Sequence, residues 1–269
     1  MGCTLTLRRR ARGGCTLDAE ELMTTANMGD PRHPSPILIA HRTAMGVRPE
    51  NTIVGIEAAV ASGVDGVEID LHATRDGVPV LMHDDSLART TGDARGVEDV
   101  TLDELRAVRV IDPHNDVGAQ PVPTFAEALV ATAATHLVIE VKQTGIEDLV
   151  ARAVREADAL DRCSLCSFDA GVCVASAAAM PGMPVSLLAA PNRDTAEVLA
   201  QAAELRLAGV SLHYSMVDEQ LVRDAHDAGL TVATWTVNDD ADVRRMHAAG
   251  VDLICGDYPA KLVEVVRGA

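Results

Sequence analysis

The stretch DEQLVRDAHDAGLTVATWTVNDDADVRRMHAAGVDLIC, residues 218–255, decides the fold. It repeats one pattern twice, in which an amphipathic segment of helical period ends at a glycine and a short apolar run follows. The helical segments are Asp218–Ala228 and Asp239–Ala248, and the apolar runs are Thr231–Thr236 and Asp252–Cys255. Repeated alternation of this kind predicts parallel strands covered by helices.

The same alternation continues through the chain from residue 37. Eight strand-like runs occur, at residues 37–41, 66–70, 136–142, 163–167, 184–189, 209–213, 231–236 and 252–255. Eight units close into a barrel more naturally than they extend as an open sheet, and the Gly-x-Gly-x-x-Gly turn of a doubly wound sheet is absent from the sequence. We therefore predict one (β/α)8 TIM barrel over residues 36–269.

One interval of the pattern is longer than the others, because residues 71–135 separate the second run from the third. A turn at Gly77 leads into a second extended segment, Val80–Asp84, and Thr101–Val108 has the pattern of a short helix capped by Thr101 and Glu104. We predict a small insertion at approximately residues 85–122. In such barrels the chemistry lies at the C-terminal ends of the strands, so we expect the insertion to roof the site.

The composition favours an aliphatic core and a small-molecule partner. Apolar residues make up 48% of the 269 residues and aromatic residues 2%, so Val, Leu, Ile and Ala must fill the core. The formal net charge of -17 opposes binding to nucleic acid or to anionic lipid, because both require Lys and Arg to neutralise phosphate. No nucleic-acid partner is therefore expected.

The cysteines and the N-terminal residues bear on the cellular compartment of the protein. Six scattered cysteines favour free thiols in a reducing compartment. The cluster Arg8–Arg10 resembles the start of an export signal, but the polar stretch Thr16–Glu21 follows it in place of an apolar region. We interpret residues 1–35 as a disordered tail. No apolar run is long enough to span a bilayer, so we predict a cytoplasmic protein without stable membrane insertion.

Titratable residues stand near the C-terminal ends of the first three predicted barrel strands and of the extra extended segment. They are His41-Arg42, Glu68 and Asp70, Glu140 and Lys142, and His83-Asp84. The two-residue period of a strand puts Glu68 on the same face as Asp70, and Glu140 on the same face as Lys142. These side chains are expected to meet at the mouth of the barrel.

Three carboxylates at one barrel mouth predict a bound cation, because like charges at short range raise one another's pKa values. With oxygen ligands only, one Mg²⁺ or Ca²⁺ ion is favoured over zinc. Arg42 and Lys142 suit the negative oxygens of a phosphodiester, while His41 and His83 suit proton transfer near neutral pH. The predicted partner is therefore a small phosphodiester.

The motifs around these residues resemble the glycerophosphodiester phosphodiesterase family. They are His41-Arg42, Pro49-Glu50-Asn51-Thr52, Glu68-x-Asp70, Thr74-Arg75-Asp76-Gly77, His83-Asp84, Leu87-x-Arg89-Thr90-Thr91, Glu140-x-Lys142, Ser167-Phe168, Trp235-Thr236-Val237-Asn238 and Asp257-Tyr258-Pro259. The resemblance spans residues 37 to about 262. It implies that Glu68, Asp70 and Glu140 are metal ligands, that His41 and His83 are the acid–base pair, and that Arg42 and Lys142 hold the phosphate.

The resemblance also implies a reaction, in which the 2-hydroxyl of the substrate glycerol attacks phosphorus and water then opens the cyclic phosphate. The products would be sn-glycerol 3-phosphate and an alcohol. Trp235 is expected to line the substrate pocket. Glu50 is expected either to belong to a turn or, with Asn51, to support the site; His72 and His213 are positioned to reach the mouth, although no motif requires them.

The sequence departs from the family pattern at two positions. Thr43 stands where Gly usually follows the His-Arg pair, so its side chain must fit close to the phosphate or turn aside. Gly256 stands where Thr usually precedes Asp257.

Two alternatives remain. One is a phospholipase D-like lipid phosphodiesterase of the sphingomyelinase D type, which shares the barrel but needs disulfides and an interfacial apolar loop. The other is a barrel without catalytic activity that binds phosphorylated ligands.

Overall fold

The structure is a computed structural model that describes residues 35–268. Apart from Ser35, the predicted tail at residues 1–35 lies outside the described residues. Among those described, no helix is both long enough and apolar enough to cross a membrane.

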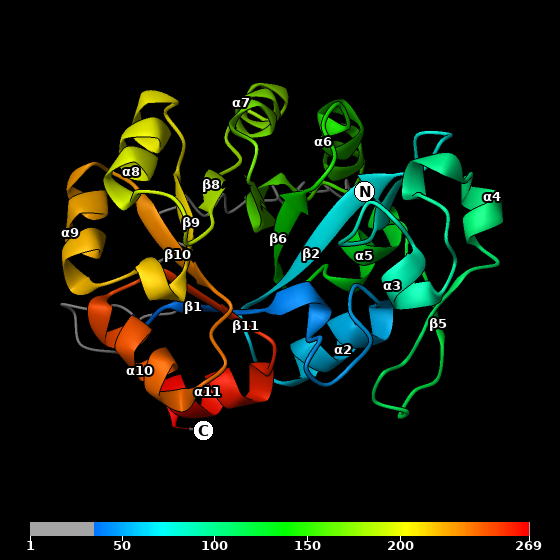
Figure 1. Cartoon of the computed structure of the whole chain (residues 1–269), viewed down its shortest axis with the longest axis horizontal. Coiled ribbons are helices and arrows are strands. Elements are labelled where there is room, and N and C mark those ends of the chain that lie inside the picture. The colour runs from blue at the N-terminus through cyan, green and yellow to red at the C-terminus, as the bar shows by residue number, and fades with distance from the viewer. Residues whose placement is uncertain (1–34, 269) are drawn as a thin grey trace, which may run out of the picture.

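Eight parallel strands form the closed barrel that the alternation predicts (Figure 1). They are β1 (Ile37–Ala40), β2 (Gly66–Ala73), β6 (His136–Val141), β7 (Cys163–Ser167), β8 (Val185–Ala189), β9 (Gly209–His213), β10 (Thr231–Trp235) and β11 (Leu253–Gly256). Strand β1 pairs with β11 on one side and with β2 on the other, which closes the sheet. The TIM-barrel prediction is confirmed, and all eight expected strand positions are correct.

Helices surround the barrel and cover its outer face (Figure 1). They are α2 (Ile53–Ala61), α5 (Phe125–Ala131), α6 (Glu147–Glu156), α7 (Ala170–Ala179), α8 (Thr195–Glu204), α9 (Glu219–Asp227), α10 (Asp240–Ala249) and α11 (Pro259–Arg267). Polar side chains cap several of them, as where Asp218 accepts the Leu221 N–H at 2.8 Å. The expected glycine stops occur as well: Gly229 and Gly250 have φ of 74° and 82°, values that favour glycine.

The segment between β2 and α5 contains short elements that pack around an apolar cluster of their own, which includes Val80, Leu87 and Leu105. They are β3 (Pro79–Leu81), α3 (Ala88–Thr91), a 3₁₀ turn (Val97–Asp99), α4 (Leu102–Leu105), β4 (Arg109–Val110) and β5 (Gln120–Pro121). Strand β3 runs antiparallel to β2. The expected helix at Thr101–Val108 begins at the predicted capping box but ends at Leu105, and the chain extends into β4 at Arg109.

This segment lies to one side of the barrel rather than over it (Figure 1). His114 Nε2 lies 3.1 Å from the Met45 carbonyl oxygen, and Arg48 pairs with Asp116 at 2.7 Å, so the segment is fastened to the loop after β1. No residue of 85–122 is among those that line the barrel pocket. The expectation of a roof is therefore wrong.

Candidate active site

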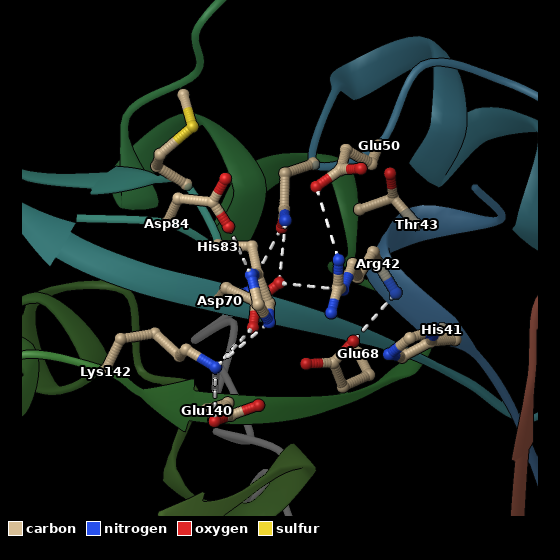
Figure 2. Close-up of polar contacts among 12 residues, drawn as sticks. His41, Arg42, Thr43, Glu50, Glu68, Asp70, His83, Asp84, Glu140 and Lys142 are labelled. Atoms are coloured by element: carbon tan, nitrogen blue, oxygen red, sulfur yellow. Dashed lines mark hydrogen bonds and ion pairs between the residues drawn. The ribbon is translucent and has the colours of Figure 1, made fainter. Parts of the chain in front are cut away.

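The predicted site residues converge at the C-terminal ends of the strands, as Figure 2 shows. They surround a cavity of about 150 Å³. Its lining includes His41, Arg42, Glu68, His83, Glu140, Lys142 and Trp235. Asp70 is 1% exposed and lies behind this lining.

A left-handed turn follows β1 and shapes one wall of the site. Arg42, Thr43 and Ala44 have φ of 43°, 64° and 78°, a run that is uncommon for residues other than glycine. The turn aims the Arg42 N–H at Glu68, whose Oε2 accepts it at 2.7 Å. Strain of this kind is typical of functional sites.

Thr43 turns aside from the pocket. It is fully buried, its Oγ1 accepts the Thr52 N–H at 3.2 Å, and it does not line the cavity. The side chain packs instead on Gly55 of α2, where an added Cβ would lie 2.3 Å from Thr43 Oγ1. The threonine at position 43 therefore does not fill the space beside His41 and Arg42 in the cavity.

Glu68, Asp70 and Glu140 offer oxygens that lie within 4.8 Å of one another, the spacing of a cation site. Burial, followed by the charges of Asp70 and Glu140, raises the pKa of Glu68 well above its usual value. Burial and Asp70 likewise raise the pKa of Glu140 to about 7. Asp70 Oδ1 is sealed from solvent and has no hydrogen-bond partner among the described residues. These three carboxylates fit a hard divalent cation.

Asn51 fixes Asp70 from behind the cation site. Its Nδ2 donates to Asp70 Oδ2 at 2.8 Å, and its Oδ1 accepts the Asp70 N–H at 3.1 Å. Burial alone would raise the pKa of Asp70, but the charges of Lys142 and Arg42 and the hydrogen bond from Asn51 outweigh it and lower that pKa. Asp70 is therefore the most acidic of the three carboxylates.

His41 is held by a carboxylate from the opposite end of the sequence. Its Nδ1 donates to Asp257 Oδ1 at 2.7 Å. Asn238 secures Asp257 in turn, because Asn238 Nδ2 donates to Asp257 Oδ2 at 2.7 Å and Asn238 Oδ1 accepts the Asp257 N–H at 2.9 Å. This arrangement leaves Nε2 as the ring nitrogen of His41 that is available for proton transfer.

His83 is held in a similar way by its sequence neighbour. Its Nδ1 lies 2.7 Å from Asp84 Oδ1, and its Nε2 lies 3.1 Å from Lys142 Nζ. An ammonium group can only donate, so Nε2 accepts from Lys142 and Nδ1 donates to Asp84. Burial lowers the pKa of His83. Its imidazole is thereby kept neutral with a defined tautomer.

A chain of ion pairs continues from Asp84 to the far side of the site. Arg89 Nε donates to Asp84 Oδ2 at 2.6 Å, and the two Arg89 Nη atoms contact both Glu50 oxygens at 2.7 and 2.8 Å. The Arg89 hydrogen bonds are the largest cause that lowers the pKa of Asp84. Glu50 Oε1 also lies 3.6 Å from Arg42 Nη1. Glu50 therefore supports both Arg42 and, through Arg89, His83.

The two cations predicted to hold phosphate lie beside the carboxylates. Lys142 Nζ is 2.7 Å from Glu140 Oε1 and 3.7 Å from Asp70 Oδ1. Arg42 Nε is 3.7 Å from Asp70 Oδ2 and has no hydrogen-bond partner within the described part of the chain. That guanidinium can still donate to an incoming anion.

Aromatic side chains form another part of the cavity wall. Trp235 lines the cavity, its Nε1 donates to the Ser211 carbonyl oxygen at 3.2 Å, and its ring meets Phe168 edge-to-face at 5.7 Å. His213 packs against Trp235 at 5.5 Å without lining the cavity. His72 is buried, with Nε2 3.4 Å from the His83 carbonyl oxygen, and also lies outside the lining.

Sequence reasoning gave no role to Asp257, Asn238, Asp84 and Arg89, although each stands in a quoted motif. Asp84 follows His83 directly, so a partnership of neighbours was readable from the sequence. Asp257 lies 216 residues from His41. Only the closure of β11 onto β1 brings that pair together.

Comparisons with known proteins show which family the chain resembles over almost all of its described length. The sequence profile of the Glycerophosphoryl diester phosphodiesterase family matches residues 41–261. The chain is similar to a glycerophosphodiester phosphodiesterase of Caldanaerobacter subterraneus, with 31% identity over 86% of this chain and 98% of that protein. A relative from Bacillus altitudinis with the same name is 27% identical over 85% of this chain and 97% of its own length.

Solved structures of phosphodiesterases have the same fold. One from Silicibacter pomeroyi superposes with a TM-score of 0.79 at 31% identity and covers 88% of this chain and 95% of its own. A phosphodiesterase from Oleispira antarctica, solved in complex with the product sn-glycerol-3-phosphate, gives a TM-score of 0.77 at 28% identity, over 86% of this chain and 97% of its own.

Proposed function

The chain belongs to the glycerophosphoryl diester phosphodiesterase family, and from this premise we propose that it hydrolyses glycerophosphodiesters to sn-glycerol 3-phosphate and an alcohol. The observation that carries the proposal is that one cavity contains two histidines, each with Nδ1 on an aspartate, beside a cluster of three carboxylates. A general acid, a general base and a cation site each lower the barrier to cleavage of a phosphodiester.

Glu68, Asp70 and Glu140 are the residues that would hold one divalent cation, Mg²⁺ or Ca²⁺. The orphaned Asp70 Oδ1 and the raised pKa values of both glutamates support this assignment. When bound, the cation neutralises the carboxylates and polarises a phosphoryl oxygen. Arg42 and Lys142 would bind the remaining phosphate oxygens as hydrogen-bond donors.

His41 and His83 would perform the proton transfers. One Nε2 takes the proton of the attacking 2-hydroxyl as the O–P bond forms, and the other Nε2 gives a proton to the leaving alcohol oxygen as its bond to phosphorus breaks. In the second step water opens the cyclic phosphate and the two roles exchange. Asp257 and Asp84 keep each ring oriented and stabilise its charged form while it holds the extra proton.

Hydrolysis of glycerophosphocholine with Mg²⁺ or Ca²⁺, and with EDTA, tests the proposal. We expect turnover that requires the cation and that is lost in His41→Ala and in His83→Ala. His247→Ala is a matched control, because His247 stands on α10 away from the cavity. Turnover that survives EDTA or His41→Ala would contradict the mechanism, and absence of turnover in the unmodified protein would contradict the function.

A further inference from the structure

The segment between β2 and α5 does not roof the cavity, yet one of its side chains reaches the residues around the site. That side chain is Arg89, on the short helix α3. Its neighbours Leu87 and Thr90 are buried. The segment is also fastened to the loop after β1 through His114 and Asp116. The backbone that carries Arg89 is therefore held firmly by the fold.

Arg89 joins two carboxylates, each of which contacts a residue of the proposed mechanism. Its Nη1 and Nη2 donate to the two Glu50 oxygens at 2.7 and 2.8 Å, and its Nε and Nη2 donate to the two Asp84 oxygens at 2.6 and 3.1 Å. Glu50 lies beside Arg42 (Figure 2). Asp84 lies beside His83 in the same view. A single exposed ion pair contributes little, but two bidentate contacts from one planar guanidinium fix the geometry of both carboxylates.

Arg89 and Arg42 compete for the same carboxylate. Arg89 occupies both oxygens of Glu50, whereas Arg42 Nη1 lies 3.6 Å from Glu50 Oε1, which is beyond hydrogen-bond distance. Arg42 Nε also has no hydrogen-bond partner among the described residues. The Glu50 side chain is only 11% exposed, and a carboxylate that is so little solvated requires a partner. Without Arg89, Glu50 would therefore pair with Arg42 and draw its guanidinium away from a phosphate.

On the basis of the proposed function, we propose that Arg89 is a positioning residue for both the phosphate-binding and the proton-transfer side of the site. On the first side it holds Glu50, so that Arg42 stays available to bind the phosphate. On the second side it holds Asp84, which orients His83. The segment between β2 and α5 thus contributes to the reaction through Arg89, although none of its residues 85–122 lines the cavity.

Arg89→Met tests the two effects separately, with whichever of Mg²⁺ and Ca²⁺ supports turnover. The kcat for glycerophosphocholine should fall by about tenfold and the Kd of sn-glycerol 3-phosphate should rise by about tenfold, each the effect of one charge-assisted hydrogen bond. Adding Glu50→Gln to this variant should restore the Kd to within about threefold, because a neutral amide no longer attracts Arg42, and should leave kcat low. A purely structural role for Arg89 would not separate the Kd from kcat in this way.

Arg95→Met is the matched control. Arg95 belongs to the same segment, its side chain is 45% exposed against 46% for Arg89, and it pairs with Asp93 at 2.6 Å without lining the cavity. Its kcat and its Kd for sn-glycerol 3-phosphate should remain those of the unmodified protein. Equal losses in Arg95→Met and Arg89→Met, or a Kd that Glu50→Gln does not restore, would overturn the positioning role.

Arg89→Lys covers the case in which Arg89→Met does not fold. Lysine keeps the charge but lacks the planar fork that reaches both carboxylates, so smaller losses of about threefold are expected in kcat and in the Kd. Unchanged kcat and Kd in Arg89→Lys would overturn the positioning role and leave the proposed function intact. No turnover of glycerophosphocholine by the unmodified protein would refute the function itself, and the Kd of sn-glycerol 3-phosphate would still test the effect of Arg89 on Arg42.

Discussion

The carboxylates at the two ends of the barrel differ in the partners that they contact. At the N-terminal end, Asp65 and Asp252 each precede a strand and each follow Gly-Val in the sequence. Asp65 accepts the Leu38 N–H at 2.7 Å and pairs with Arg267. Asp252 accepts the Val232 N–H at 2.7 Å and lies 2.9 Å from His226 Nε2. Each of these carboxylates joins neighbouring strands through its Oδ2, which also lies beside a basic side chain.

At the C-terminal end, three carboxylates lie within 4.8 Å of one another, and Asp70 Oδ1 is sealed from solvent without a hydrogen-bond partner among the described residues. Burying like charges together is unfavourable in the absence of a cation. The carboxylates at the N-terminal end therefore stabilise the fold, whereas those at the C-terminal end are arranged to bind a ligand. Substitutions at the two ends should separate catalysis from stability.

The largest effect is expected for Asp70→Asn, which removes a charge from the catalytic end and keeps the shape of the side chain. Loss of a cation ligand should lower kcat/KM for glycerophosphocholine by about a thousandfold. The melting temperature without added metal should fall only slightly, because the lost pairing of Asp70 with Lys142 and Arg42 is offset in part by relief of the repulsion with Glu68 and Glu140. A large fall in melting temperature would remove the contrast between the ends.

A smaller loss of activity is expected for Asp257→Asn, which acts through His41. The variant keeps the contact with Asn238 but no longer stabilises the charged imidazole, so kcat should fall by about a hundredfold with little change in KM. Asp84→Asn offers the parallel test at His83. A change confined to KM would show that these aspartates position substrate instead of the histidines.

Local periodicity was sufficient to predict the strands and the faces of Glu68, Asp70 and Glu140, because both depend on near neighbours in the sequence. It could not predict which groups pair across the barrel. The contact of Glu50 with Arg89 joins residues 39 positions apart, and it depends on how the segment after β3 packs. The direction of the Thr43 side chain could not be predicted either. It depends on Gly55 of the adjoining helix, where the absence of a side chain leaves room for Thr43 Oγ1.

At the N-terminal end, Asp65→Asn should affect stability and leave catalysis intact. The variant weakens a charge-assisted hydrogen bond to the Leu38 N–H and the pairing with Arg267, which should lower the free energy of unfolding by about 2 kcal/mol. Urea denaturation measures this change. kcat for glycerophosphocholine should stay within about twofold at temperatures where the variant is folded. A catalytic defect without destabilisation would contradict the division between the ends.

The smallest effect is expected when the pH is lowered. Protonation of His136, at the start of β6, should then reduce the free energy of unfolding. Burial lowers the pKa of His136 to about 4, whereas the unfolded chain has the ordinary value near 6.5, so the unfolded state binds the proton more readily. The stability that comes from neutral His136 is complete above about pH 6.5 and is lost as the pH falls toward 4. Between pH 6.5 and 5 this residue should cost at most about 2 kcal/mol in the free energy of unfolding.

His136→Gln isolates that contribution, because an amide can keep a hydrogen bond to Ser164 and does not titrate. Its free energy of unfolding should fall less steeply between pH 6.5 and 5 than that of the unmodified protein. His247→Ala provides the matched histidine control and should keep the original slope. Parallel slopes for His136→Gln and the unmodified protein would show that the N-terminal end is not where the acid sensitivity lies, and would move it to the carboxylates and histidines of the catalytic end.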